Sequence, residues 1–216
     1  VIVTKGTALQ TVTTGEDGKA AYTLDLPIAN SYYISESQAP YGYVRNSSDV
    51  YSFNFNYLSE TTAKATFSHE FVNDRTTAKI HIFKVDKETG LPVPQGDATL
   101  EEAVYGLYAR DDIMHPDGAT GVVFKANDLV ATMTTDANGD AEVNNLYLGN
   151  YYVKEITPPE GYLLDEEEHD VVCDYEGDLV AEVSRSTTSK EQVMKQPFQL
   201  IKVSDNGDDT EAPLLE

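Results

Sequence analysis

The sequence predicts an all-β protein built from tandem β-sandwiches, and three observations lead to this expectation. Short segments rich in Val, Ile, Thr, Tyr and Phe recur along the 216 residues, separated by tight turn sequences. Two unrelated motifs repeat with almost the same period. No stretch keeps a helical periodicity over three turns. Many short strands in a repeat of about 120 residues are typical of a β-sandwich.

Ten segments carry the period-two alternation or the β-branched and aromatic enrichment of strands. They are residues 20–26, 31–36, 51–57, 64–72, 79–85, 104–109, 129–134, 151–156, 169–174 and 179–184. Turns are expected where Gly, Asn and Asp cluster, as in Glu88-Thr89-Gly90 and Ala137-Asn138-Gly139, because these residues adopt the backbone angles of tight turns. A single helical turn is expected at 101–103.

The internal repeat defines the domain organisation. The segment 32–43, YYISESQAPYGY, returns at 151–162 as YYVKEITPPEGY, an offset of 119 residues. The segment 80–85, IHIFKV, resembles 198–203, FQLIKV, at an offset of 118 residues. Agreement between two motifs indicates a tandem array.

The phase of the repeat predicts three parts. Residues 1–76 are the later part of a first unit, residues 77–196 are one complete unit, and residues 197–216 are the first strand of a third repeat. The sequence has no start methionine, signal peptide or cell-wall sorting tail, so we expect a piece of a longer protein.

Composition excludes several classes of protein. With 15 Lys and Arg against 37 Asp and Glu, the net charge is −22, which excludes nucleic-acid partners and disfavours an anionic membrane surface. No apolar run approaches the roughly 20 residues of a membrane span, so no membrane insertion is expected. The single cysteine, Cys173, rules out an internal disulfide and is most simply a small buried hydrophobe.

Two glutamates occupy equivalent positions in the repeated motif. Alternate residues of a strand share a face. Glu36 is therefore expected on the same face as Tyr32 and Ile34, and Glu155 on the same face as Tyr151 and Val153. If that face is the core, burial raises the pKa of the carboxyl group and makes it a candidate proton shuttle. A rim glutamate with the opposite register is the alternative, but the repetition favours burial.

Two lysines follow the same logic. Lys84 and Lys202 share strand faces with apolar residues, and a desolvated lysine loses its proton more easily and becomes a nucleophile. The alternatives are a snorkelling side chain or a simple ion pair with glutamate. With a nearby Asn or Asp, Lys and Glu would instead form an amide cross-link that releases ammonia or water.

These motifs carry a resemblance to a known family. The segment KVDKETG at 84–90, the tripeptide Gly106-Leu107-Tyr108 and the glutamate box at 151–162 resemble the collagen-adhesin B-type (Cna B-type, SpaA-like) domain. The resemblance implies prealbumin-like (reverse-Ig) β-sandwiches of Gram-positive surface adhesins and pilins. It also implies an intramolecular isopeptide bond from a first-strand lysine to a last-strand Asn or Asp, catalysed by the box glutamate.

Carried over residue by residue, the resemblance implies Glu36 and Asn73 as catalyst and acceptor of the first unit. It implies Lys84 and Glu155 as nucleophile and catalyst of the complete unit, and Lys202 as nucleophile of the third. The family's Asn-x-Pro acceptor position holds Lys195 instead.

Since lysine cannot be acylated by lysine, we expect Lys84 and Glu155 to be in contact without a covalent bond. If a bond does form, Asp170, Asp174 or another side chain must be the acceptor. A further possibility is that Lys202 of one molecule bonds to Asn73 of another.

No metal or cofactor is expected. The four histidines, His69, His81, His115 and His169, lack metal-ligand spacing. The acidic segments 136–140 and 205–209 lack the downstream glutamate of a calcium loop and are expected to be turns. The run 166–170 is expected to be a solvated charge cluster.

The resulting expectation is a structural stalk or spacer segment of a cell-wall-associated adhesin or pilin-like protein. It would lie outside a Gram-positive cell, contact neighbouring repeats of the same protein, and support binding to an unidentified host surface or matrix ligand. It would not be an enzyme beyond single-turnover self-modification. Two alternatives stay open: a module that binds host protein or glycan through Tyr41, Tyr43 or Tyr57, and an accessory β-sandwich of a secreted hydrolase.

Overall fold

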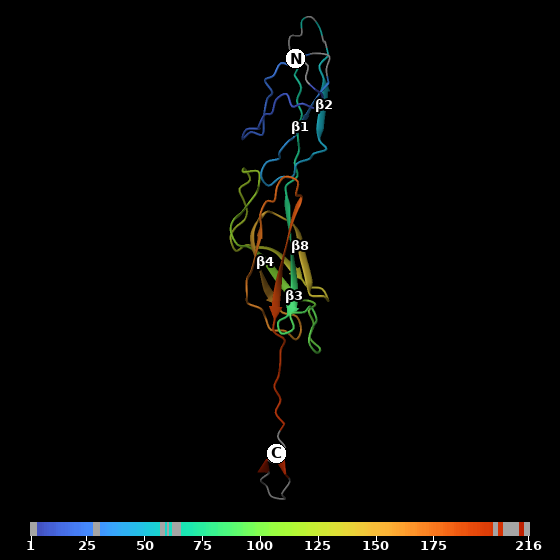
Figure 1. The fold of residues 1–216 in the computed structure, drawn as a ribbon. Coiled ribbons are helices and arrows are strands. Elements are labelled where there is room, and N and C mark those ends of the chain that lie inside the picture. The colour runs from blue at the N-terminus through green and yellow to red at the C-terminus, as the bar shows by residue number, and fades with distance from the viewer. Residues whose placement is uncertain are drawn as a thin grey trace. The chain divides into compact units, whose positions relative to one another are not determined.

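The computed structural model describes residues 4–27, 31–56, 59, 61, 66–200, 203–204 and 212–213. These residues form strands, turns and irregular segments, and none of them is helical (Figure 1). The all-β expectation is therefore confirmed. The chain divides into two compact units, Val1–Ala39 with Arg45–Asn73, and Pro40–Val44 with Asp74–Glu216.

The first unit contains one described antiparallel pair, β1 (Ser31–Ser35) and β2 (Val50–Asn54). Tyr32 lies opposite Phe53 in this pair, and their rings stack with centroids 5.8 Å apart. Further rings extend the cluster, since Phe67 stacks on Phe53 at 5.1 Å. Aromatic packing thus organises this unit.

Two strands predicted in the first unit are wrong within the described residues. Residues 20–26 form no strand, because the backbone amides of Thr23 and Leu24 donate to the side-chain oxygen of Gln10 instead of to a neighbouring strand. Residues 66–72 place their alternating aromatic rings against the cluster but form no ladder.

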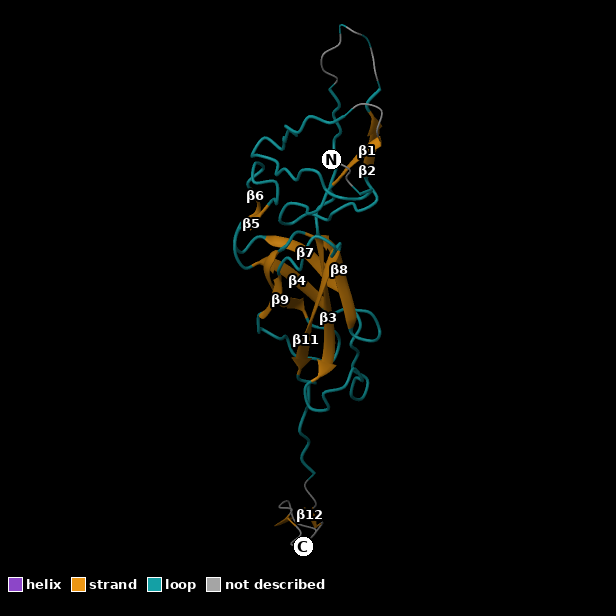
Figure 2. Cartoon of the chain, turned by 45° about the horizontal axis from the view of Figure 1, so that its top comes forward, coloured by secondary structure: helices purple, strands orange, loops and turns teal. Residues whose placement is uncertain are grey.

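The second unit is built from two sheets, visible in Figure 2. One has the strand order β10-β9-β4-β7, and the other has the order β11-β3-β8. The strands of the first sheet are His169–Cys173 (β10), Gly149–Thr157 (β9), Val104–Ala109 (β4) and Leu129–Thr134 (β7). Those of the second are Glu182–Glu191 (β11), Thr77–Asp86 (β3) and Asp140–Leu146 (β8).

Two short antiparallel strand pairs complete the described strands. They are β5 (Ile113–Met114) with β6 (Val122–Phe124), and β12 (Val203–Ser204) with β13 (Ala212–Pro213). The segment predicted as a helical turn at 101–103 is a turn with Glu102 at a φ of 68°. This left-handed backbone value is incompatible with a right-handed helical turn.

The inward faces of the two sheets share one hydrophobic core. Alternate residues of β3, β4 and β9 are fully buried there, as the two-residue period of a strand requires. The core includes Ala78, Ile80, Ile82, Tyr105, Leu107, Ala109, Tyr151, Val153 and Cys173. The predicted burial of Cys173 is confirmed.

The first and last strands of the sandwich lie side by side. β11 pairs with β3 in parallel, with Lys84 opposite Ser189 and Asp86 opposite Glu191. The predicted strand 179–184 was therefore misplaced, because residues 178–179 form a turn and the strand runs from 182 to 191. β8, which pairs with the other edge of β3, was not predicted, since its sequence DAEVNNL has few strand-forming residues.

Candidate cross-linking site

Lys84 and Glu155 meet between the two sheets. Lys84 on β3 is fully buried, and Glu155 on β9 is 3% exposed. Lys84 Nζ lies 3.4 Å from Glu155 Oε1. Both side chains occupy the core faces that the strand alternation indicated, so a buried amine and a buried carboxyl group form the centre of the site.

A second carboxyl group completes the centre. Glu191, at the end of β11, is 1% exposed, and its Oε2 contacts Lys84 Nζ. The parallel register explains this contact: Glu191 lies opposite Asp86, two residues beyond Lys84, and shares its inward face. One lysine therefore lies between two glutamates.

Two hydroxyl groups surround the other oxygen of Glu191. Tyr105 OH donates to Glu191 Oε1 at 2.6 Å, and Ser189 Oγ lies 3.2 Å from the same oxygen. Tyr105 and Ser189 are both fully buried. The two oxygens of Glu191 thus have different environments, one facing hydroxyl groups and the other facing the amine.

Asp165 forms hydrogen bonds with Glu155, Ser189 and His169. Its backbone amide donates to Glu155 Oε2 at 2.8 Å, and its carboxylate accepts from Ser189 Oγ at 3.0 Å. His169 Nε2 lies 3.1 Å from the same carboxylate oxygen. Asp165 therefore fixes the orientation of Glu155 while its own charge is held by neighbouring donors.

The Pro-x-Gly-Tyr end of the repeated motif covers the lysine. Tyr162 is fully buried, with Lys84 Nζ 5.1 Å from its ring centroid and its hydroxyl 3.2 Å from Asp86 Oδ2. Gly161 has a φ of +87°, and a Cβ there would lie 2.5 Å from Ala98 Cβ. Only glycine fits that turn, which aims Tyr162 into the site.

Burial shifts both Lys84 and Glu155 toward their neutral forms. Desolvation lowers the pKa of Lys84 to about 8, against the opposing attraction of Glu155. Desolvation also raises the pKa of Glu155, although the hydrogen bond from the Asp165 amide and the charge of Lys84 pull it the other way. A neutral amine facing a protonated carboxyl group is the arrangement that nucleophilic attack with proton transfer requires.

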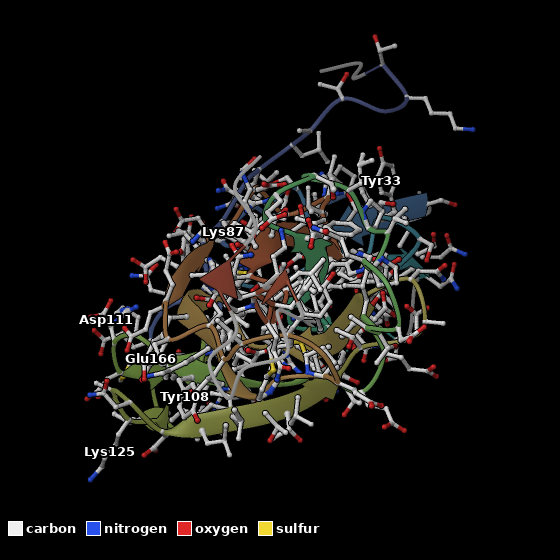
Figure 3. All side chains as sticks on the ribbon, turned by 90° about the horizontal axis from the view of Figure 1, so that it is seen from below. Tyr33, Lys87, Tyr108, Asp111, Lys125 and Glu166 are labelled. Carbon is white, nitrogen blue, oxygen red and sulfur yellow. The ribbon has the colours of Figure 1, made fainter. Side chains whose placement is uncertain are left out.

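Several other charged side chains of the second unit lie outside the core. Figure 3 shows Asp111, Lys125 and Glu166 at its periphery, and all three are exposed.

The placement of Lys195 as the residue at the acceptor position needs correction. Lys195 lies beyond the end of β11, its side chain is 59% exposed, and it pairs with Glu88. The described residue that faces Lys84 from the last strand is Glu191. The family spacing failed because the strand ends four residues before Lys195 and brings Glu191 to the buried end.

The first unit holds the other expected pair. Asn73 Nδ2 donates to Glu36 Oε2 at 2.7 Å, and both side chains are half-buried. The sequence-derived catalyst and acceptor of this unit are therefore in direct contact. Lys202, the expected nucleophile of the third repeat, lies outside the described residues.

The tyrosines expected in a ligand-binding face differ in exposure. Tyr41 is 71% exposed and packs against Tyr175 with ring centroids 4.8 Å apart. Tyr43 is half-buried, and its carbonyl oxygen accepts from the Tyr175 hydroxyl. Tyr57 lies outside the described residues.

The described residues contain neither a metal-binding cluster nor a membrane-spanning helix. Among them, no group of three or more His, Cys, Asp or Glu side chains is placed to hold a metal ion. The described part of the chain also contains no apolar helix of the length that crossing a bilayer requires.

Sequence reasoning missed four residues of the site, namely Glu191, Ser189, Tyr105 and Asp165. One signal was available for the first two. Val183, Ser189 and Glu191 have the same parity along β11, whereas Ser184, Thr188 and Lys190 alternate with them and are exposed. No local pattern indicates the contact of Tyr105 with Glu191, because it joins two strands distant in sequence. Asp165 lies in an irregular segment between β9 and β10, which has no periodicity that would indicate the direction of its side chain.

Comparisons with known proteins agree with this architecture. The family described as SpaA, prealbumin-like fold domain, matches residues 1–70 and 78–187. No curated protein matches the chain. A solved structure of the Bacillus anthracis TIE protein is 26% identical with a TM-score of 0.59, over 85% of this chain and 28% of that one. The chain therefore spans just over a quarter of that relative.

Two pilin structures show weaker likeness. The minor pilin GBS52 of Streptococcus agalactiae is 18% identical with a TM-score of 0.38, over 88% of this chain and 70% of that one. The T6 backbone pilin of serotype M6 Streptococcus pyogenes is 26% identical with a TM-score of 0.33, over 45% of this chain and 16% of that one. Since the SpaA match covers most of the sequence, the chain belongs to the SpaA family of prealbumin-like fold domains.

Proposed function

We propose that this chain is a structural segment of a Gram-positive surface adhesin or pilin, and that an amide bond between Lys84 and Glu191 closes its second unit. The observation that carries the proposal is the buried contact of Lys84 Nζ with Glu191 Oε2, beside Glu155. Its family membership and its likeness to the TIE protein support a structural role.

The bond would form by condensation within the folded unit. The neutral Lys84 amine attacks Cδ of Glu191, a C–N bond forms, and the bond from Cδ to Oε2 breaks. Of the three protons of the original ammonium group, one stays on the amide nitrogen and two leave with Oε2 as water. Glu155 carries these protons between nitrogen and oxygen, since its Oε1 lies 3.4 Å from Nζ.

The topology gives such a bond a mechanical consequence. β3 is the first strand of the sandwich and β11 the last, and they are parallel neighbours. A pulling force enters through Thr77 and leaves after Glu191. A covalent link from Lys84 to Glu191 carries this force directly from one strand to the other, so the rest of the sandwich stays unloaded.

The first unit supports the same chemistry in part. The hydrogen bond from Asn73 to Glu36 holds an acceptor beside a carboxyl group, as a cross-linking reaction with a lysine nucleophile requires. The net charge of −22 suits a soluble spacer at the outside of a cell. In this role, the chain contacts neighbouring repeats of the same protein. Other parts of that protein bind the host ligand.

Single-molecule force spectroscopy tests the mechanical role. The whole chain is pulled through its ends, beside a Glu191→Ala variant. The roughly 105 residues between Lys84 and Glu191 would add about 350 Å of extended chain on unfolding. We expect this extension in the variant and not in the parent chain. The same extension in both would overturn the proposed function.

A further inference from the structure

We propose that Tyr105 and Ser189 form an oxyanion site for the condensation of Lys84 with Glu191. Their hydroxyl groups hold Oε1 as the oxygen that the amide keeps, and so make Oε2 the oxygen that leaves as water. This inference rests on the proposed function and assigns two further catalytic residues to it.

The geometry separates the two oxygens of the acceptor. Tyr105 OH donates to Oε1 of Glu191 at 2.6 Å, and Ser189 Oγ approaches the same atom at 3.2 Å. The lysine amine contacts Oε2. When the amine adds to Cδ and Oε2 is protonated as the leaving oxygen, the negative charge develops on Oε1, which already faces two hydroxyl groups.

Strand register fixes both donors relative to the reacting groups. Tyr105 on β4 lies directly opposite Glu155 on β9. Ser189 on β11 lies directly opposite Lys84 on β3. Each hydroxyl therefore sits on a rigid strand beside the residue that supplies the proton shuttle or the nucleophile, and no loop movement is needed to align them.

The site excludes water, which strengthens the effect of each donor. Tyr105 and Ser189 are fully buried, as are Lys84 and Glu191 to within 1%. Burial raises the pKa of Tyr105, so its hydroxyl stays protonated and remains a donor throughout the reaction. Removing one donor from an oxyanion site of this kind slows acyl transfer by about 10²- to 10³-fold.

The two donors are not equivalent. Ser189 Oγ carries one proton and lies near two acceptors, Glu191 Oε1 at 3.2 Å and Asp165 Oδ2 at 3.0 Å. The Tyr105 hydroxyl makes the shorter bond to Glu191. Loss of the tyrosine hydroxyl is therefore expected to slow the reaction more than loss of the serine hydroxyl.

Cell-free synthesis of the full chain tests the inference. Samples are quenched in acid at intervals, and intact mass reports the fraction that has lost one water. The variants are Tyr105→Phe and Ser189→Ala. The controls are Tyr151→Phe, a buried tyrosine whose hydroxyl donates to the Tyr147 carbonyl, and Ser186→Ala, an exposed serine of the same strand.

We expect the parent chain and both controls to lose water at the same rate. Tyr105→Phe should lose it about 10²-fold more slowly or slower still, and Ser189→Ala should be intermediate. Circular dichroism and resistance to proteolysis establish that each variant is folded, and Ser189→Ala decides the test if Tyr105→Phe does not fold. Parent-like rates in the folded variants would overturn the oxyanion site alone. A parent chain that never loses water would overturn the cross-link itself.

Discussion

Lys84 Nζ contacts Glu191 Oε2 across two neighbouring parallel strands, the first and the last of the sandwich. The contact is fully buried and has Glu155 beside it. A buried lysine with two carboxyl groups carries a desolvation cost that an ordinary ion pair only partly offsets. Conversion to a neutral amide removes the charges of both reacting groups, which gives the condensation a driving force in this site.

Glu155→Gln is expected to prevent the bond while leaving both reacting groups in place. The variant cannot carry protons from nitrogen to oxygen, so its mass should equal that calculated from its own sequence, with no water lost. Without the link, the unfolded state regains the entropy of a loop of roughly 100 residues, which lowers the free energy of unfolding by about 5 kcal/mol. Intact mass and urea unfolding measure the two effects.

The matched control for that experiment is Glu166→Gln, which changes an exposed glutamate of the same unit. It should keep the parent chain's mass deficit and stability. Loss of the deficit in this control as well would mean that the effect of Glu155→Gln is not specific to the site.

Glu191→Gln is expected to form the same bond with a different leaving group. The hydroxyls of Tyr105 and Ser189 face the position of Oε1, so they select the amide oxygen and leave the amide nitrogen toward Lys84. Ammonia then departs instead of water, and the product has the same mass as the parent's. Glu191→Asp is one methylene shorter and should remain unlinked. A linked Asp variant, or an unlinked Gln variant, would contradict this assignment of the two oxygens.

The rate of bond formation is expected to depend on pH through Lys84. Burial lowers the pKa of its amine to about 8, so the neutral, nucleophilic fraction rises as pH approaches that value and levels off above it. Burial raises the pKa of Glu155, which widens the pH range in which its carboxyl group can protonate the leaving oxygen. The slow Tyr105→Phe chain is the form in which to measure this by intact mass. A rate independent of pH between 6 and about 9 would contradict the role of Lys84 as the nucleophile.

Asp86 is expected to contribute stability that is lost in acid. Burial opposes its charge, but hydrogen bonds from the Thr89 amide and hydroxyl, from Gln95 and from Tyr162 prevail and lower its pKa from 3.8 to about 2. A depressed pKa means that its stabilisation is present above the unfolded value and disappears as pH falls toward about 2.

Urea unfolding between pH 2 and about 5 checks this. Asp86→Asn should be less stable than the parent chain at neutral pH and should show a weaker pH dependence in this window. Asp174→Asn, an exposed change in the same unit, should follow the parent chain. Parallel pH curves for the parent and Asp86→Asn would contradict the prediction.

Strand alternation was enough to predict which way Lys84 and Glu155 face, because a period of two assigns every residue of a strand to one side. It did not identify Glu191. That residue reaches the site through parallel pairing of two strands about a hundred residues apart, and a local pattern does not encode such register. The motif spacing indicated Lys195 instead, which the structure places on the surface beside Glu88.

In the first unit, a segment with a strand-like composition does not form a strand. Residues 20–26 have the composition of a strand, yet the backbone amides of Thr23 and Leu24 donate to the side chain of Gln10. A high β-propensity shows that a segment is compatible with a strand. Whether the strand forms depends on the tertiary hydrogen bonds available to its backbone. The contact of Asn73 with Glu36 agrees with the catalyst and acceptor that the family resemblance implied for this unit.

Intact-mass analysis of the purified chain, followed by peptide mapping, tests the central claim most directly. The proposed bond predicts a mass lower than that of the sequence by one water, and a branched peptide in which Lys84 is joined to Glu191. A full mass with separate linear peptides for β3 and β11 would contradict it.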